Sequence, residues 1–241
     1  MAELQTTYSS DLAPGYPGMV ANGERGNRIS RTCETSAGIG FGKAVYRGSG
    51  DHGCVLTQTL TGAGSAASGN VGTSTITSAP TVGAGAKIGR YVITQLTTAS
   101  TGALQVSDPD GNIVAKGNIG TAITTIPGIT SVTVTNGGTA TAGDQFYIDV
   151  TGNPFLGIAI ATSDLPLMPG ADADEYQQYD NVAILTGGTP IWVTAGGSVT
   201  DGAPVFVDSS GDFVAISGVP LAGWVFDTTG ADDALVKIVK R

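Results

Sequence analysis

The chain has little of what enzymes use for chemistry. Among its 241 residues it has one histidine, His52, and two cysteines, and charged residues make up only 13%. An active site needs several titratable groups that converge in a pocket, and no nucleophile motif of the G-x-S-x-G kind occurs in the sequence. We therefore expect a protein that is not an enzyme and that works by binding and packing.

Ligands for a metal are also too few. Asp51, His52 and Cys54 lie close together in the sequence, but a structural zinc site needs about four ligands at characteristic spacing, and the remaining ones are missing. Cys33 and Cys54 could form a disulfide, although two buried free thiols are the favoured interpretation for a protein made in the cytosol. We expect no metal and no cofactor.

Long hydrophobic runs and positive charge are scarce as well. The longest apolar stretches, such as residues 155–161, are far shorter than the roughly 20 residues that a membrane helix requires. The polar first eleven residues do not resemble a secretory signal. The net charge of −9 repels the phosphate backbone of nucleic acids. We expect synthesis in the cytosol, no membrane partner and no direct nucleic-acid binding.

What the chain does have is 37 glycines, which divide it into many short runs of Val, Ile, Thr and Phe. Runs of four to eight such residues between turn residues are typical of β-sandwiches and small barrels. The C-terminal part has this pattern throughout, and we expect Trp192, Phe206 and Trp224 to be core anchors. The fold class that follows is all-β.

Residues 61–153 differ in composition from the rest and are expected to form an inserted module, here called the insert. This stretch is dominated by Gly, Thr, Ala and Ser, and its first residues resemble a flexible linker. Asp108, Pro109, Asp110 and Gly111 predict a β-turn between two of its strands. The alternative, a calcium loop, lacks the glutamate of the twelfth position. We expect the insert to be an immunoglobulin-like β-sandwich.

The segments on either side of the insert, residues 36–60 and 154–241, are then expected to pair into one discontinuous β-barrel or sandwich. The carboxylates of residues 172–177 lack a partner base, so an exposed loop is expected there.

Residues 1–35 are expected to form an extended N-terminal arm. Two prolines and two glycines within residues 13–19 exclude a helix there. The arm is either a flexible terminus or a segment that becomes ordered against a neighbouring subunit. In the second case the residues expected at the interface are Leu4, Tyr8, Tyr16, Met19, Arg25, Arg28 and Arg31.

Several of these segments resemble known phage proteins. The segments similar to tailed-bacteriophage structural cement proteins are residues 4–8, 13–19, 29–31, 38–45, 155–158 and 176–182. The segments of the insert that resemble a module of phage head-decoration proteins are residues 85–91, 106–111 and 142–150.

The resemblance implies a structural protein on the outer surface of an icosahedral capsid, where it binds the major capsid protein and stabilises contacts between its subunits. The domain formed by the segments around the insert would bind the capsid, and the insert would project outwards. A homo-oligomer is expected, with a trimer favoured and a dimer as the alternative. A second hypothesis is adhesion to host glycans or receptors through the insert, whose candidate aromatic residues are Tyr91, Phe146 and Tyr147.

Overall fold

The computed structural model describes residues 14–163 and 174–241. All elements assigned in these residues are β-strands, which confirms the predicted all-β class. In the same ranges no helix is long and apolar enough to cross a membrane. Leu4 and Tyr8, two of the expected interface residues, lie outside the described residues.

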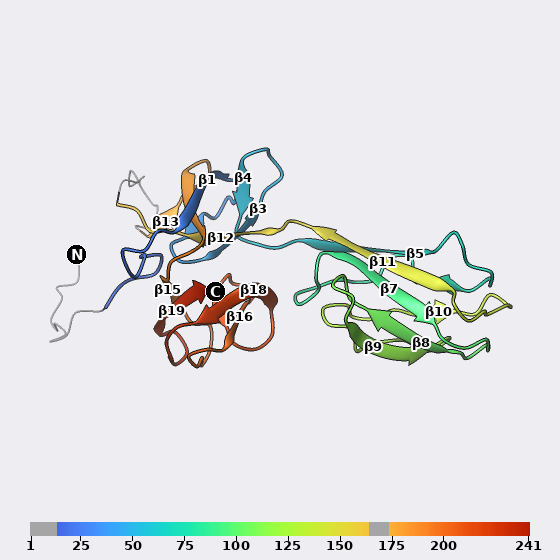
Figure 1. Ribbon diagram of the computed structural model, residues 1–241. Helices are drawn as coiled ribbons and strands as arrows, with labels where there is room; N and C mark the ends of the chain where they lie inside the picture. The colour runs from blue at the N-terminus through green and yellow to red at the C-terminus, as the bar shows by residue number, and fades with distance from the viewer. Residues whose placement is uncertain (1–13, 164–173) are drawn as a thin grey trace, which may run out of the picture.

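Five strands close into a barrel in the order β1-β14-β12-β3-β4. Four of the five seams are antiparallel, whereas β1 and β4 pair in parallel through Thr32–Gly53 and Cys33–Cys54. The strands come from both sides of the insert in sequence (Figure 1). Their bounds are β1 Asn27–Cys33, β3 Ala44–Arg47, β4 Gly53–Val55, β12 Phe155–Ala159 and β14 Asn181–Gly187.

Strand β1 corrects the expected extent of the N-terminal arm. Residues 27–33 were assigned to the arm, but they pair with β14 from Asn27 to Thr32 and so form part of the barrel wall. The side chains of Ile29 and Cys33 lie on the inner side of the strand, whereas those of Arg28, Ser30 and Thr32 are exposed. Alternation with a period of two lets this segment bury one side and expose the other.

A short two-stranded sheet, β2 (Ile39–Gly40) with β13 (Glu175–Tyr176), lies beside the barrel. Tyr176 is fully buried, packs edge to face on Phe41 and donates a hydrogen bond of 2.6 Å to the carbonyl of Ile160. The expectation of an exposed loop is therefore wrong for this part of the acidic segment, because Tyr176 belongs to the core.

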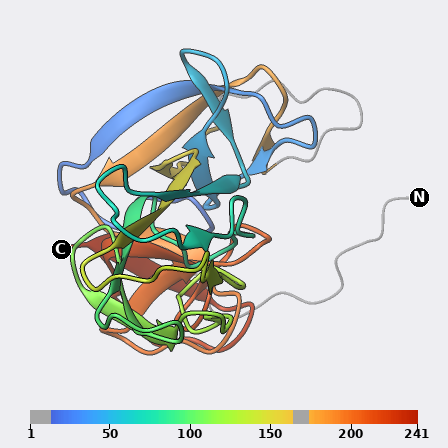
Figure 2. The ribbon, with the colours of Figure 1, turned by 90° about the vertical axis from the view of Figure 1, so that its right-hand side faces the viewer.

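The C-terminal part forms a second sheet of five strands, here called the C-terminal sheet, in the order β15-β19-β18-β16-β17. It shares a hydrophobic core with the barrel, in which Tyr46, Phe155 and Trp224 pack edge to face. The view along the long axis shows the two bodies one above the other (Figure 2). Strand bounds are β15 Ile191–Thr194, β16 Pro204–Val207, β17 Phe213–Val214, β18 Val219–Phe226 and β19 Leu235–Lys240.

The insert contains a five-stranded sheet in the order β5-β11-β7-β8-β9 and a separate pair, β6 with β10. Phe146, Ile148 and Val150 of β11 point into a core that contains only residues of the chain between Leu60 and Val150. Strand bounds are β5 Leu60–Ala66, β6 Thr75–Ile76, β7 Gly89–Gln95, β8 Ala103–Ser107, β9 Ile113–Asn118, β10 Val134–Thr135 and β11 Gln145–Gly152.

This arrangement does not confirm the expected immunoglobulin-like sandwich. Opposite the large sheet the chain forms only the two-residue strands of β6 and β10 and single bridges such as Val82–Ile129 and Ile123–Val132. The predicted turn is confirmed: Gly111 has a φ of 85° and donates its N–H to the carbonyl of Asp108 at 2.9 Å.

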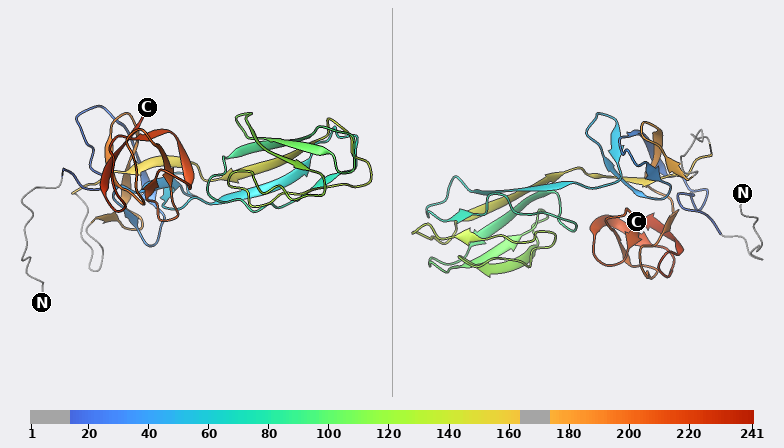
Figure 3. Two further views of the ribbon diagram at one scale, coloured as in Figure 1. Left: turned by 90° about the horizontal axis from the view of Figure 1, so that it is seen from below. Right: turned by 180° about the vertical axis from the view of Figure 1, so that it is seen from behind.

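A two-stranded neck joins the insert to the rest of the molecule. β5 and β11 pair from Ala66–Phe146 down to Leu60–Gly152, and the insert extends away from the two bodies (Figures 1 and 3). The Asn153 side chain links both neck strands, because it accepts from Thr59 N at 2.6 Å and donates to Thr57 O at 2.9 Å.

Strand β9 is one of the two edge strands of the insert sheet, the other being β5. The pairing of β9 with β8 is interrupted by a bulge at Val106–Ser107, and Lys116 in the middle of β9 is exposed. Bulges and lysines are the features by which natural edge strands avoid pairing with other chains.

Candidate functional site

The described part of the N-terminal arm lies along the outer edge of strand β15. Gly18 N donates to Trp192 O at 2.7 Å, and Trp192 N donates to Met19 O at 2.9 Å. Gly18 O also accepts from Ala161 N at 2.9 Å, which ties the same segment to the barrel. These residues therefore bridge the two bodies of their own chain.

The bridge depends on a close approach of two glycine backbones. Gly18 has a φ of 81° and Gly42 a φ of 72°. A Cβ on Gly18 would lie 2.7 Å from Ala161 N and 2.9 Å from Gly42 N, closer than real Cβ atoms come to such atoms. Only glycine satisfies both the backbone angle and the contact.

Tyr16 and Met19, two expected interface residues, have different surroundings. Met19 is half-buried, whereas Tyr16 is 57% exposed. Tyr16 lines a cavity of about 300 Å³ together with Pro17, Phe41 and Asp174. Of the two, Tyr16 is the one that a partner can reach.

Arg25, Arg28 and Arg31 follow one another along strand β1 and the loop before it and are here called the basic strip; Arg28 and Arg31 have opposite parity in the strand, so their side chains leave it on opposite sides. Arg25 and Arg28 are exposed and Arg31 is half-buried. At about 3.3 Å per residue, the strip spans roughly 20 Å. The ion pairs within the described ranges use Lys43, Lys87, Arg90, Lys237 and Arg241, and none involves the strip. In an acidic chain these three charges have no carboxylate partner in the described residues.

His52 takes part in the strip rather than in a metal site. Arg31 Nη1 donates to Ser30 O at 3.0 Å and lies 3.3 Å from His52 Nδ1. A guanidinium has only donors, so Nδ1 accepts in this contact. Residues 14–163 and 174–241 hold no group of three or more His, Cys, Asp or Glu side chains that could bind a metal.

The two cysteines meet at the parallel seam of the barrel. Cys33 and Cys54 are register partners, both are fully buried, and both are free thiols. Burial raises the pKa of Cys33 and, with the charge of Cys33 next in importance, raises the pKa of Cys54 to about 12. Thiols with so little thiolate react slowly.

Sequence reasoning missed the turn that precedes strand β14. Tyr179 on this turn is 77% exposed and has a φ of 74°. Its N–H donates to Cys33 O at 2.8 Å, so the turn is attached to the end of β1 that follows the basic strip. A positive φ at tyrosine has no signal in the sequence.

The insert offers little to a glycan through its expected aromatic residues. Tyr91 and Phe146 are buried in its core. Tyr147 faces outwards, but the guanidinium of Arg90 lies 4.4 Å above its ring centre and pairs with Asp149 at 2.7 Å. None of the three presents a ring that is free for stacking on a sugar.

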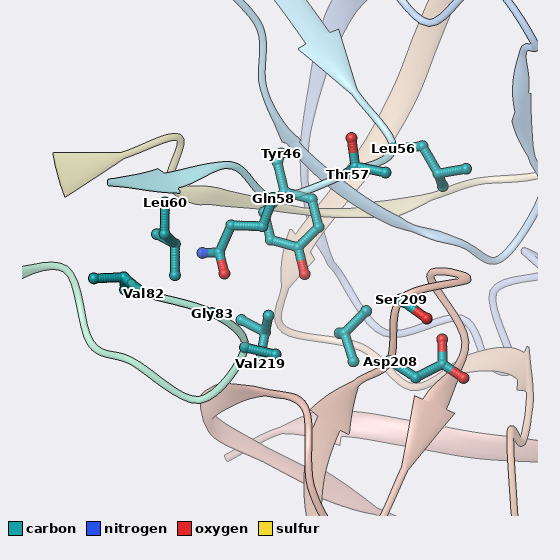
Figure 4. A pocket seen from close by; sticks show the side chains of 12 residues that line it. Tyr46, Leu56, Thr57, Gln58, Leu60, Val82, Gly83, Asp208, Ser209 and Val219 are labelled. Carbon is teal, nitrogen blue, oxygen red and sulfur yellow. The ribbon is translucent and has the colours of Figure 1, made fainter. Parts of the chain in front are cut away.

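A cavity of about 290 Å³ lies where the barrel, the insert and the C-terminal sheet meet (Figure 4). The polar ends of Tyr46 and Gln58 point into it, beside Val82 and Val219 (Figure 4). Within the described residues, Tyr46 Oη and Gln58 Oε1 have no hydrogen-bond partner. Burial, followed by the charge of Asp208, raises the pKa of Tyr46.

This geometry provides surfaces for adhesion, and the sequence comparison agrees with it. Residues 4–153 and 63–240 match the family described as Structural cement protein (E217 gp24/Pam3 gp6). The chain belongs to the phage structural cement protein family. A search of curated proteins finds no significant match.

Membership settles the general role of the chain. Cement proteins are structural proteins of the phage particle, they associate with capsid proteins, and they are located in the virion capsid. The resemblance identified from the sequence is thereby confirmed.

Proposed function

We propose that this cement protein binds the outer surface of the phage head and stabilises contacts between major capsid protein subunits without catalysis. The observation that carries the proposal is that Arg25 and Arg28 of the basic strip are exposed and have no carboxylate partner in the described ranges of a chain of net charge −9. Exposed, unpaired arginines are typical of protein interfaces.

The shape of the molecule supports an orientation on the head. The described arm residues from Pro14 onward and strand β13 lie toward one end of the long axis, and the insert lies at the other (Figure 1). With the arm, the barrel and the C-terminal sheet on the shell, the insert projects outwards through its neck. The domain boundaries that follow are 36–60 with 154–241 for the capsid-binding part, joined by strand β1, and 61–153 for the insert.

A homo-oligomer suits this role, with a trimer favoured and a dimer as the alternative. A clip placed on a local symmetry axis touches every subunit around that axis. Stable association needs about 800 Å² of buried surface per partner. Each shell repeats the same site many times, so a small stabilisation at each site adds up over the lattice.

The test is charge reversal on the strip. Purified heads that lack this chain are mixed with the wild-type protein or with Arg28→Glu, and bound protein is measured after sedimentation. We expect the variant to bind at least about tenfold more weakly, because it opposes the charge of the partner surface. Added salt should weaken wild-type binding for the same reason.

Lys116→Glu is the matched control. Lys116 is exposed on the insert, has no ion pair in the described residues, and undergoes the same change of charge. It should bind heads as the wild type does. Equal losses for both variants would show that net charge alone matters and would refute the role of the strip.

A further inference from the structure

Tyr179 has the largest exposed fraction of the tyrosines in the described residues and adopts a backbone angle that tyrosine rarely takes. Its side chain is 77% exposed and its φ is 74°. The non-glycine residues that share a positive φ in the described ranges are Ser217 and Asp233, both small. A bulky residue in the left-handed region is strained, and such strain is concentrated at functional sites.

Packing within the chain does not explain the strain. The aromatic contacts of the described residues join Phe41 to Tyr176, and Tyr46 to Phe155 and Trp224, and none of them involves Tyr179. The ring is 77% exposed, so its own packing within the described residues does not offset the strain.

Backbone hydrogen bonds hold the turn in place. Tyr179 N donates to Cys33 O at 2.8 Å, and Cys33 N donates to Asp180 O at 2.9 Å. Within the turn, Gln177 N donates to the Asp180 carboxylate at 2.7 Å, and Asp180 N donates to Gln177 O at 3.0 Å. A side chain presented on a fixed backbone loses little conformational freedom on binding, which favours affinity.

Carboxylates surround the turn. Asp180 lies within the turn, the Glu175 carboxylate accepts from Gln177 Nε2 at 2.6 Å, and the backbone carbonyl of Glu34 accepts from Gln178 Nε2 at 3.5 Å. The N–H groups of Ser49 and Gly50 bind Glu34 and hold the pKa of its carboxyl below the usual range. These three residues flank the turn that carries Tyr179 and are here called the acidic collar: Glu34, Glu175 and Asp180.

The collar decides between two classes of partner. In a twofold contact with a second copy of this chain, each collar would face the same collar, and like charges would repel. A basic surface would be attracted instead, and lysine or arginine also binds favourably over an aromatic ring. Tyrosine is among the residues that most often dominate binding energy at interfaces.

We infer that Tyr179 is an anchor that enters an apolar pocket of the major capsid protein, with lysine or arginine side chains of that protein around the acidic collar. This inference rests on the proposed function and adds a specific contact to it. Because the turn is bonded to Cys33 at the end of β1, the anchor continues the basic strip. A contact surface with opposite charges at its two ends fits its partner in one orientation only.

The experiment uses the full-length chain and purified heads that lack it. Tyr179→Gly removes the ring while suiting the left-handed backbone, so the variant should unfold at the same temperature as the wild type or higher. We expect its affinity for heads to fall at least about tenfold. Tyr179→Phe keeps the ring and should bind within about threefold of the wild type. Val71→Ala, on the insert and also 77% exposed, is the matched control and should bind normally.

Each outcome either supports or overturns the role of Tyr179 as an anchor. Wild-type binding with undiminished binding of Tyr179→Gly would overturn the anchor and leave the proposed function intact. Absence of binding by the wild type would overturn both. Light scattering distinguishes the remaining case: if Tyr179→Gly dissociates an oligomer but each chain still binds heads, the pocket belongs to a second copy and the inference is wrong.

Discussion

At the scale of single residues, two buried tyrosines of this protein differ in one respect that can be measured. Tyr46 and Tyr176 are both almost inaccessible, and each packs edge to face on a phenylalanine. Tyr176 donates its hydroxyl to Ile160 O at 2.6 Å, whereas Tyr46 Oη has no partner in the described residues. A buried hydroxyl without a partner costs free energy that a phenyl ring would not.

We therefore expect Tyr46→Phe and Tyr176→Phe to have different effects on stability. The first should leave the free energy of unfolding unchanged or raise it by up to about 1 kcal/mol, because no hydrogen bond is lost. The second should lower it by about 1–2 kcal/mol, because it leaves the buried Ile160 carbonyl without its donor. Urea unfolding followed by tryptophan fluorescence measures both. Equal destabilisation would show that Tyr46 Oη forms a hydrogen bond with water in the cavity between the barrel, the insert and the C-terminal sheet.

At the scale of elements, the bridge between the barrel and the C-terminal sheet depends on Gly18. Gly202 has the same φ of 81°, but a Cβ there would meet no atom within 4 Å. The two positions therefore share the backbone preference and differ only in the close approach to Gly42 and Ala161.

Alanine at the two positions separates these effects. Gly202→Ala should cost about 1–2 kcal/mol, which is the strain of an alanine in the left-handed region. Gly18→Ala should cost at least about 1 kcal/mol more, since its Cβ would also displace backbone atoms. The difference is measured from urea unfolding curves of the two variants. Equal costs would mean that the segment around Gly18 shifts without loss.

Short-range sequence patterns were enough to predict the turns and strands that depend only on neighbouring residues. The turn at Asp108–Gly111 and the alternating strand β11 follow from proline, glycine and period-two signals. Strand β1 was missed because Arg31 occupies an inward position of the pattern and its charge suggested an arm. Trp224 is a core residue as expected, while Trp192 is only half-buried, covered by Gly15 and Lys237.

Features that depend on distant pairing could not be predicted in this way. The parallel seam that brings Cys33 next to Cys54 requires the barrel to close. The position of Tyr179 depends on hydrogen bonds to Cys33, which is far away in the sequence. Of the candidate site, the residue types of the basic strip were visible in the sequence, and their place on a barrel wall was not.

At the scale of the whole molecule, the hydrophobic cores are separate. The buried core of the insert contains no residue of the two clusters that hold the barrel and the C-terminal sheet together. The neck ends with Leu60 paired to Gly152, so the two ends of the insert lie about 5 Å apart.

Replacement of residues 61–151 by a two-residue Asn-Gly turn should therefore leave the rest of the protein folded. We expect a single cooperative unfolding transition and wild-type occupancy of purified heads, because the surfaces proposed to touch the shell are retained. Circular dichroism and sedimentation with heads measure the two properties. A folded variant that no longer binds heads would show that the insert contacts the shell.

The bulge and the exposed lysine on the edge strand β9 have a consequence for whole particles. With the inserts projecting from the shell as proposed, a collision between two particles would bring many β9 edges together. A flat, uncharged edge would join particles through continuous sheets. The bulge at Val106–Ser107 and the charge of Lys116 disfavour such pairing, so we expect inserts of neighbouring particles not to join edge to edge.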